Sequence, residues 1–163
     1  FFGTGLPPAS VNEPSWPLMR PRLADSRLDP SPADIAWSRG AFNDLLRIRS
    51  SSTLFRLQSA AAVAERLTFL NTGPQQVPEV IVGHLLGRGY PGANFSEILY
   101  LVNVGTGPRT LHFDGERGKH YVLHPVHRAS GATDRRAAEL ASYDAASGSF
   151  TVPARTAVVF VVE

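Results

Sequence analysis

Three of the five histidines stand close together and are the first candidates for chemistry. His120, His124 and His127 lie at steps of four and three, which would align them on a helix, and imidazole nitrogens are common zinc ligands. Residues 121–127 (YVLHPVH) are strand-like, however, and a period of two puts His127 on the face opposite the other two. The chain has no cysteine and no nearby carboxylate that completes a ligand set. We therefore expect surface or hydrogen-bonded histidines and no metal site.

Other catalytic chemistries lack their motifs. Asp114 and Glu116 resemble a carboxylate pair, but they flank Gly115 in a turn, where both would be solvated and unperturbed. No Gly-x-Ser-x-Gly motif is present, and the serines at 50–52 are more simply a helix end than nucleophiles. The glycine-rich residues 87–92 (GRGYPG) lack the lysine of a phosphate-binding loop and indicate a hairpin connection. We expect no catalytic residue in this chain.

Aromatic side chains offer a binding function instead of a catalytic one. An exposed ring can stack on a sugar, and the candidates for a binding module are Trp16, Trp37, Tyr90 and Tyr121. Burial is the commoner fate of such side chains because their bodies are large and apolar. The sequence leaves both readings open.

Composition limits the class of partner. The 163 residues carry 16 basic and 14 acidic side chains without a basic cluster, which argues against a nucleic-acid partner. No apolar run approaches the roughly 20 residues that cross a bilayer, so we expect no membrane partner. The length allows one good core, or a modest domain with an appendage. The sequence begins without Met, and it looks like a piece of a longer protein.

The elements that must position these residues begin with one long helical signal, residues 31–57. Ser31 can cap a helix, Pro32 fits its first position, and Asp34 favours its positive end. At 100° per residue the apolar side chains share one arc, which predicts a buried face. That arc holds Ile35, Phe42, Leu45 and Leu46.

Proline and serine mark the segments on either side of this helix. Six prolines in residues 1–30 predict an ordered loop or an extended arm rather than a regular helix, and its anchors would be Trp16, Leu18 and Leu23. Ser59 can cap a second, short helix through residues 60–67.

From residue 67 onward the pattern is typical of strands. Apolar runs of strand length with β-branched content, and shorter candidates between turn signals, predict seven or eight strands. Their spacing indicates an antiparallel β-sandwich in a mainly β chain. The runs are residues 67–71, 79–86, 96–104, 109–113, 121–124, 138–143, 149–152 and 156–162.

Several segments together resemble the C-terminal end of pullulanase-type debranching enzymes, which belong to the α-amylase family of glycoside hydrolases. Residues 3–7 (GTGLP), followed by Trp16-Pro17-Leu18 and residues 20–25 (RPRLAD), are similar to the loop after the last barrel strand. Residues 42–57 (FNDLLRIRSSSTLFRL) resemble the family's F-x-x-L-L-x-x-R-x-S-x-x-L-F-R-L signature. Residues 67–73 (LTFLNTG), 123–126 (LHPV) and 150–156 (FTVPART) resemble its later strands.

The resemblance implies a domain organisation. Residues 1–57 would be the last loop and last helix of a (β/α)8 barrel, and residues 58–163 a C-terminal β-sandwich packed against it. The intact enzyme would hydrolyse α-1,6-glucosidic bonds through carboxyl groups on earlier barrel strands. This segment alone would be inactive and its role mainly structural; the alternative is an α-glucan-binding module.

The resemblance also implies partners and site residues. Phe1 and Phe2 would border the sugar site of the parent, because the loop follows a barrel strand at the C-terminal face. The partners would be the remaining barrel and, through the parent, α-glucan, with self-association of the isolated segment as an alternative. No cofactor is expected in this segment, while the parent's calcium requirement and its compartment, secreted or cytoplasmic in bacteria or plastid, stay open.

Overall fold

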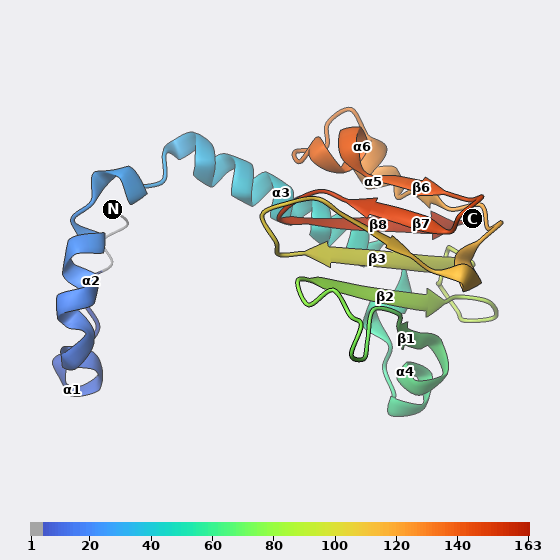
Figure 1. Cartoon of the computed structure of the whole chain (residues 1–163), viewed down its shortest axis with the longest axis horizontal. Coiled ribbons are helices and arrows are strands. Elements are labelled where there is room, and N and C mark those ends of the chain that lie inside the picture. The colour runs from blue at the N-terminus through green and yellow to red at the C-terminus, as the bar shows by residue number, and fades with distance from the viewer. Residues whose placement is uncertain (1–4) are drawn as a thin grey trace. The chain divides into compact units, whose positions relative to one another are not determined.

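The computed structural model describes residues 5–163, and the chain divides into two compact units, Phe1–Arg39 and Gly40–Glu163 (Figure 1). The expectation that residues 1–30 contain no regular helix was wrong. Pro17 lies in the first turn of its helix, where a missing N–H costs nothing, and only Pro21 lies inside. The Trp16 Nε1–H donates to the Pro7 carbonyl at 3.1 Å. The elements are α1 (Ala9–Asn12), η1 (Glu13–Ser15), α2 (Trp16–Leu23) and η2 (Ser26–Leu28).

The long helix α3 (Pro32–Ser50) begins and ends where the sequence predicts. The Ser31 N–H donates to Asp34 Oδ2 at 2.8 Å and the Asp34 N–H donates to Ser31 Oγ at 3.2 Å, which satisfies two donors reciprocally. The predicted buried face was wrong. Asp44 and Ile48 are the buried side chains of α3, whereas the apolar arc is exposed by 42, 61, 39 and 44% at Ile35, Phe42, Leu45 and Leu46.

Two short helices connect α3 to the strands. In η3 (Thr53–Arg56), the Ser52 hydroxyl accepts a hydrogen bond from the Leu54 N–H. In α4 (Ala60–Arg66), the Ser59 hydroxyl accepts one from the Ala62 N–H at 3.1 Å, so the predicted cap is confirmed.

The strands form two antiparallel sheets. The five-stranded sheet has the order β1 (Leu67–Phe69), β2 (Val80–Leu86), β3 (Glu97–Asn103), β8 (Thr156–Val162) and β5 (Val122–Leu123). The three-stranded sheet has the order β4 (Arg109–His112), β7 (Ser149–Val152) and β6 (Ser142–Asp144). The strand predictions for residues 149–152 and 156–162 are confirmed to the residue.

Helical turns replace strand in two predicted places. Within residues 5–163 helices cover more residues than strands, so the expectation of a mainly β chain holds only for the part that follows α4. The strand-like reading of residues 121–127 holds only for β5, because Pro125 starts α5 (Pro125–Arg128) and the His124 Nδ1 accepts the Val126 N–H at its first turn. Residues 138–143 divide between α6 (Arg136–Leu140) and β6. The predicted turn at Gly115 is one turn of 3₁₀ helix, η4 (Asp114–Glu116).

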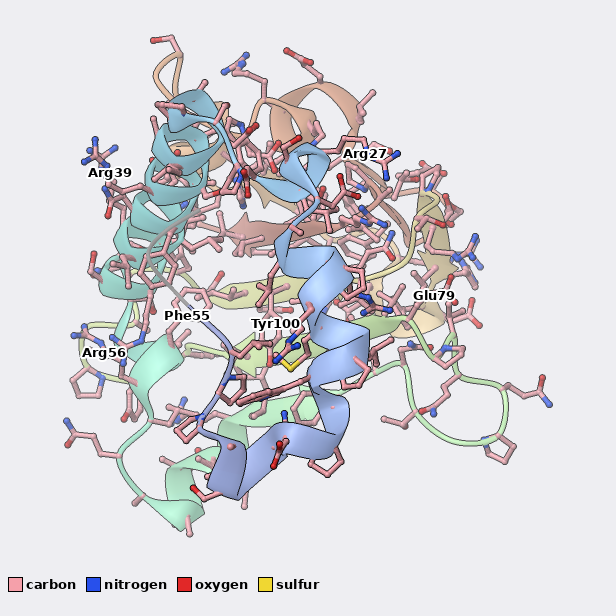
Figure 2. The ribbon with its side chains drawn as sticks, turned by 90° about the vertical axis from the view of Figure 1, so that its left-hand side faces the viewer. Arg27, Arg39, Phe55, Arg56, Glu79 and Tyr100 are labelled. Carbon is pink, nitrogen blue, oxygen red and sulfur yellow. The ribbon has the colours of Figure 1, made fainter. Side chains whose placement is uncertain are left out.

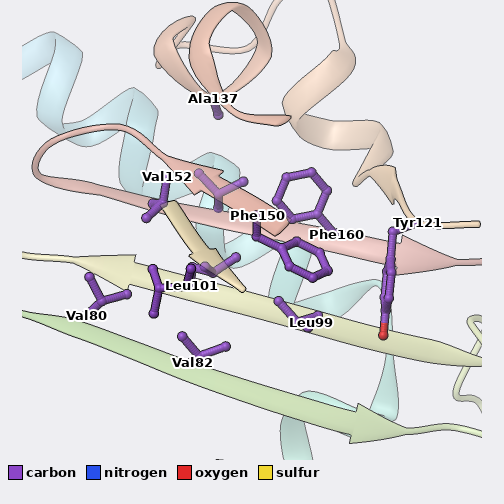
Figure 3. Close-up of a cluster of buried hydrophobic side chains, with 11 residues drawn as sticks. Val80, Val82, Leu99, Leu101, Tyr121, Ala137, Phe150, Val152 and Phe160 are labelled. Atoms are coloured by element: carbon purple, nitrogen blue, oxygen red, sulfur yellow. The ribbon is translucent and has the colours of Figure 1, made fainter. Parts of the chain in front are cut away.

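Two hydrophobic clusters hold the larger unit together. One is shared by the two sheets and includes Leu99 and Leu101 of β3, Phe160 of β8 and Phe150 and Val152 of β7 (Figure 3). The other joins α3 and η3 to the opposite face of the five-stranded sheet, through Ile48, Leu54, Leu85, Ile98 and Val161. None of the helices in residues 5–163 is long and apolar enough to cross a bilayer.

Candidate functional site

A cluster of ionisable side chains lies at one end of the face that the two sheets share. His84 follows Val80 and Val82 on the inner side of β2, and Glu97 precedes Leu99 on the inner side of β3. Since His84 pairs with Leu99 in the register, its side chain lies diagonally beside Glu97. The His84 Nε2–H donates to Glu97 Oε2 at 2.7 Å.

Glu116, Lys119 and Tyr121 complete this ionic cluster from the segment between β4 and β5. The Lys119 ammonium lies 2.7 Å from Glu97 Oε2 and 2.8 Å from Glu116 Oε2. The Tyr121 hydroxyl lies 2.9 Å and 2.8 Å from the same two oxygens. The expectation of a solvated Glu116 was therefore wrong, since only 5% of this residue is exposed.

The cluster shifts the pKa values of Glu97, Lys119 and Tyr121. Burial raises the pKa of the Glu97 carboxyl, but hydrogen bonds from Lys119, Tyr121 and His84 outweigh burial and lower it below its ordinary value. Burial lowers the pKa of Lys119, and the two carboxylates outweigh it and raise that pKa. Burial, followed by the Glu116 carboxylate, raises the pKa of Tyr121 far above its ordinary range. Tyr121 therefore stays a hydrogen-bond donor.

The ligand types in this cluster are those of a divalent-metal site. One ligand atom each from His84, Glu97 and Glu116 lies within 4.8 Å of the others. The Lys119 ammonium, however, already contacts both carboxylates and supplies the positive charge that they need. The arrangement is satisfied without a metal ion, and we assign it a role in closing the end of the core.

A second polar cluster ties the end of α3 to α5. The His124 Nε2 lies 3.0 Å from the Ser51 hydroxyl, and His127 Nε2 accepts the Val159 N–H at 3.3 Å. Burial lowers the pKa of His124 to about 4, and it also lowers the pKa of His127. The rings of His124 and His127 lie together, with centroids 6.5 Å apart, while His120 is exposed.

The aromatic candidates for sugar stacking lie in different places. Trp16 is half-buried in the smaller unit, and Trp37 on α3 is 45% exposed. Tyr90 is half-buried, with the Arg66 guanidinium carbon 4.8 Å from its ring centroid. Tyr121 is only 6% exposed because its ring packs edge-on against Tyr143 and Phe150, so it is removed from the candidates. Phe1 and Phe2 lie outside the described residues.

His84, Glu97 and Lys119 were missed by sequence reasoning. The signal for His84 was present, because a histidine inside the apolar run of residues 79–86 needs a buried partner. The identity of that partner depended on the β2–β3 register, which places Glu97 opposite Leu86. Nothing local in the sequence relates Lys119 to either residue.

Comparison with known proteins identifies relatives over the whole chain. The family described as "Alpha-1,6-glucosidases, pullulanase-type, C-terminal" matches residues 1–163. Pullulanase 1, chloroplastic, of Arabidopsis thaliana is 40% identical over 170 residues, which cover 98% of this chain and 17% of that protein. The chain thus spans about a sixth of the length of this relative.

Solved structures share the fold. Apo pullulanase from Klebsiella pneumoniae superimposes with a TM-score of 0.80 at 25% identity and covers 97% of this chain and 17% of that one. The maltotriose complex of PulA from the same organism gives a TM-score of 0.81 at 24% identity, with coverage of 97% and 17%. PulA from Klebsiella oxytoca gives 0.69 at 22% identity, with coverage of 82% and 12%.

Proposed function

The chain belongs to the family of C-terminal regions of pullulanase-type α-1,6-glucosidases, and we propose on this premise that its role is mainly to brace the catalytic barrel of a debranching glycoside hydrolase. In this proposal the parent enzyme hydrolyses α-1,6-glucosidic bonds with carboxyl groups outside these residues. Residues 1–57 supply the last loop and last helix of the barrel, and residues 58–163 form the C-terminal β-sandwich.

The observation that carries the proposal is the division of α3 into two faces. One face is tied to the rest of the larger unit, because Ile48 is 3% exposed and packs on the five-stranded sheet, and Asp44 Oδ2 accepts the Thr133 N–H at 2.7 Å from the segment between α5 and α6. Another face leaves Phe42, Leu45 and Leu46 exposed by 61, 39 and 44%. Apolar side chains grouped on one helix face mark an interaction surface, and the barrel that precedes this segment in the proposed parent is its natural partner.

The apolar surface that docking would bury also supports the bracing role. Burial of apolar surface contributes about 25 cal/mol per Å², so covering several such side chains stabilises a docked barrel by a few kcal/mol. A close approach also holds α3 against the segment that contains Thr133, since a Cβ on Gly40 would lie 2.6 Å from Thr133 Oγ1. A helix held on one side can hold another domain on the other.

The test uses the intact enzyme that contains this segment. The double variant Phe42→Asp, Leu46→Asp should lower the melting temperature of the catalytic domain, while kcat for pullulan, measured well below that temperature, stays unchanged. Val104→Asp is the control, because Val104 is 67% exposed at the end of β3. An unchanged melting temperature in the double variant refutes the bracing role.

Catalytic activity of the chain itself is a separate outcome. The 163 residues alone should release no reducing ends from pullulan, since a glycosidase needs two carboxyl groups that flank the scissile bond. Release of reducing ends by the purified chain would show that the segment carries its own active site.

A further inference from the structure

A partly polar cavity of about 540 Å³ lies beside η3, and its lining includes no residue of the ionic cluster or of the exposed face of α3. Two of its lining residues are the first and last residues of η3, one follows η3, and two come from the loop between β2 and β3. The lining is Thr53, Arg56, Gln58, Tyr90 and Pro91.

Hydrogen bonds fix the loop on η3. The Thr53 N–H donates to the Gly92 carbonyl at 3.0 Å, and the Thr53 hydroxyl donates to the Pro91 carbonyl at 2.7 Å. At the base of the loop, Arg66 Nη1 donates to the carbonyls of Leu86 and Arg88, each at 3.1 Å. Because both walls are held before any ligand arrives, the cavity is preformed, and binding there costs little ordering.

The side chains that line the cavity have unused hydrogen-bonding capacity. Within residues 5–163, the Arg56 guanidinium and the Gln58 amide have no hydrogen-bond partner, and both residues are exposed. Figure 2 shows Arg56 at the periphery of the ribbon. Tyr90 is held differently, because Arg66 lies over its ring at 4.8 Å from the centroid.

This combination suits a neutral polyhydroxylated ligand. A pyranose ring presents C–H groups that pack on an aromatic side chain and hydroxyls that accept from a guanidinium and exchange hydrogen bonds with an amide. No acidic side chain is among the lining residues, so the cavity has nothing to hold a cation. We propose that this cavity is an α-glucan-binding subsite, in which Tyr90 supplies the packing surface and Arg56 and Gln58 the hydrogen bonds. The choice of α-glucan over other sugars rests on the proposed function.

The rival ligand is an anion, since Arg56 lines the cavity and Arg66 and Arg88 lie near it. The half-polar lining and the tyrosine favour the sugar, because an anion gains nothing from an aromatic wall. The two ligands are distinguished by titration with inorganic phosphate beside the sugar.

The experiment titrates the full 163-residue chain with maltotriose in a calorimeter and follows amide shifts by NMR. Saturable binding is expected, with shifts confined to residues 53–58 and 87–92. Tyr90→Ala should weaken binding about tenfold and Gln58→Ala about threefold, which correspond to the loss of one packing partner and of one hydrogen bond. Gln75→Ala is the matched control, since Gln75 is an exposed glutamine in the loop before β2.

Each other outcome overturns the proposal. Absence of binding up to about 10 mM, or binding that Gln58→Ala leaves unchanged, excludes this subsite. Equal affinity for the β-linked trisaccharide cellotriose excludes α-glucan selectivity, and shifts at these residues with phosphate but not maltotriose assign the cavity to an anion. Gln58→Ala decides the matter if Tyr90→Ala fails to fold, because Gln58 is exposed. These measurements do not depend on the stability of the barrel. The bracing role can therefore be refuted while the sugar-binding subsite is supported, and the subsite can be refuted while the bracing role is supported.

Discussion

The Ser51 hydroxyl and the His124 Nε2 lie 3.0 Å apart and join the end of α3 to the start of α5 across 73 positions of the chain. The His124 Nδ1 accepts the Val126 N–H at 3.2 Å, so the ring is neutral and its proton is on Nε2. The Ser51 hydroxyl accepts a hydrogen bond from this Nε2–H and donates one to the Ile48 carbonyl at 2.7 Å. A protonated His124 would lose its acceptor, which makes this contact sensitive to acid.

We expect stability to fall on acidification between about pH 6.5 and pH 4. Burial lowers the pKa of folded His124 to about 4 from an ordinary value of 6.5, so in this window the unfolded chain binds a proton that the folded chain does not. The free energy of unfolding therefore drops by up to about 1.4 kcal/mol per pH unit for this one residue. Urea unfolding at a series of pH values measures the slope.

Two variants isolate the contribution of His124. His124→Asn keeps a side-chain acceptor for the Val126 N–H but cannot titrate, so it should reduce the slope and leave the part that buried His127 contributes. His120→Asn removes an exposed histidine and should leave it unchanged. Equal slopes for His124→Asn and the parent chain would contradict the assignment.

Asp44 supports a prediction on the attachment of α3. Its Oδ2 accepts the Thr133 N–H at 2.7 Å, and Asp44→Ala leaves that partly buried donor without its acceptor. The expected loss is about 1–3 kcal/mol in the free energy of unfolding, measured by urea titration, whereas Asp44→Asn, which keeps an acceptor, should lose less. Asn43→Ala on the exposed side of α3 serves as the control, and an equal loss in both alanine variants would show that the Thr133 contact contributes nothing.

How far the sequence predicts this structure depends on whether a signal is local. Caps at Ser31 and Ser59 and the strand at residues 156–162 were read correctly, because their chemistry lies within a few residues. The buried face of α3 was predicted wrongly. Apolar side chains at helical spacing indicate an interaction surface, but they do not show which part of a protein covers it. Asp44 is buried because Thr133, 89 positions away, needs an acceptor.

The candidate site shows the same limit. Glu116 was expected to be solvated because it flanks Gly115 in a predicted turn, yet the chain brings Lys119 and Tyr121 over it and Glu97 beside them. Clusters of this kind are fixed by strand register and by loops between sheets. Neither follows from spacing along one segment.

Lys119 should be a stability determinant. Lys119→Met leaves the carboxylates of Glu97 and Glu116 without their shared cation, and we expect a loss of about 1–3 kcal/mol, less than for a fully buried pair because the lysine side chain is 28% exposed. Adding Glu97→Gln to this variant removes one of the two unpaired charges and should restore part of the lost free energy of unfolding. Arg88→Met is the exposed control, and a loss for Lys119→Met no larger than for that variant would argue against a coupled cluster.

Truncation tests where the folded unit begins. Residues 40–163 contain both hydrophobic clusters and should unfold cooperatively, whereas residues 58–163 lack Ile48 and Leu54, which are 3% and 1% exposed. Loss of one buried leucine costs about 2–5 kcal/mol, so the shorter chain should have a clearly lower melting temperature. Calorimetry of the two truncated chains decides this, and equal midpoints would favour residues 58–163 as the autonomous domain.

The exposed face of α3 should govern association of the isolated chain without contributing to its folding. Phe42→Ser with Leu46→Ser changes side chains that are 61% and 44% exposed, so the free energy of unfolding should change by less than about 1 kcal/mol, while concentration-dependent association decreases. Sedimentation velocity and urea unfolding measure the two quantities. Ile48→Ser is the contrasting variant, because this residue is only 3% exposed. It should lower the free energy of unfolding by about 3 kcal/mol without reducing association. If the surface variant were destabilised as much as Ile48→Ser, the apolar arc would have to be buried in the isolated chain, and the barrel would lose its proposed docking face.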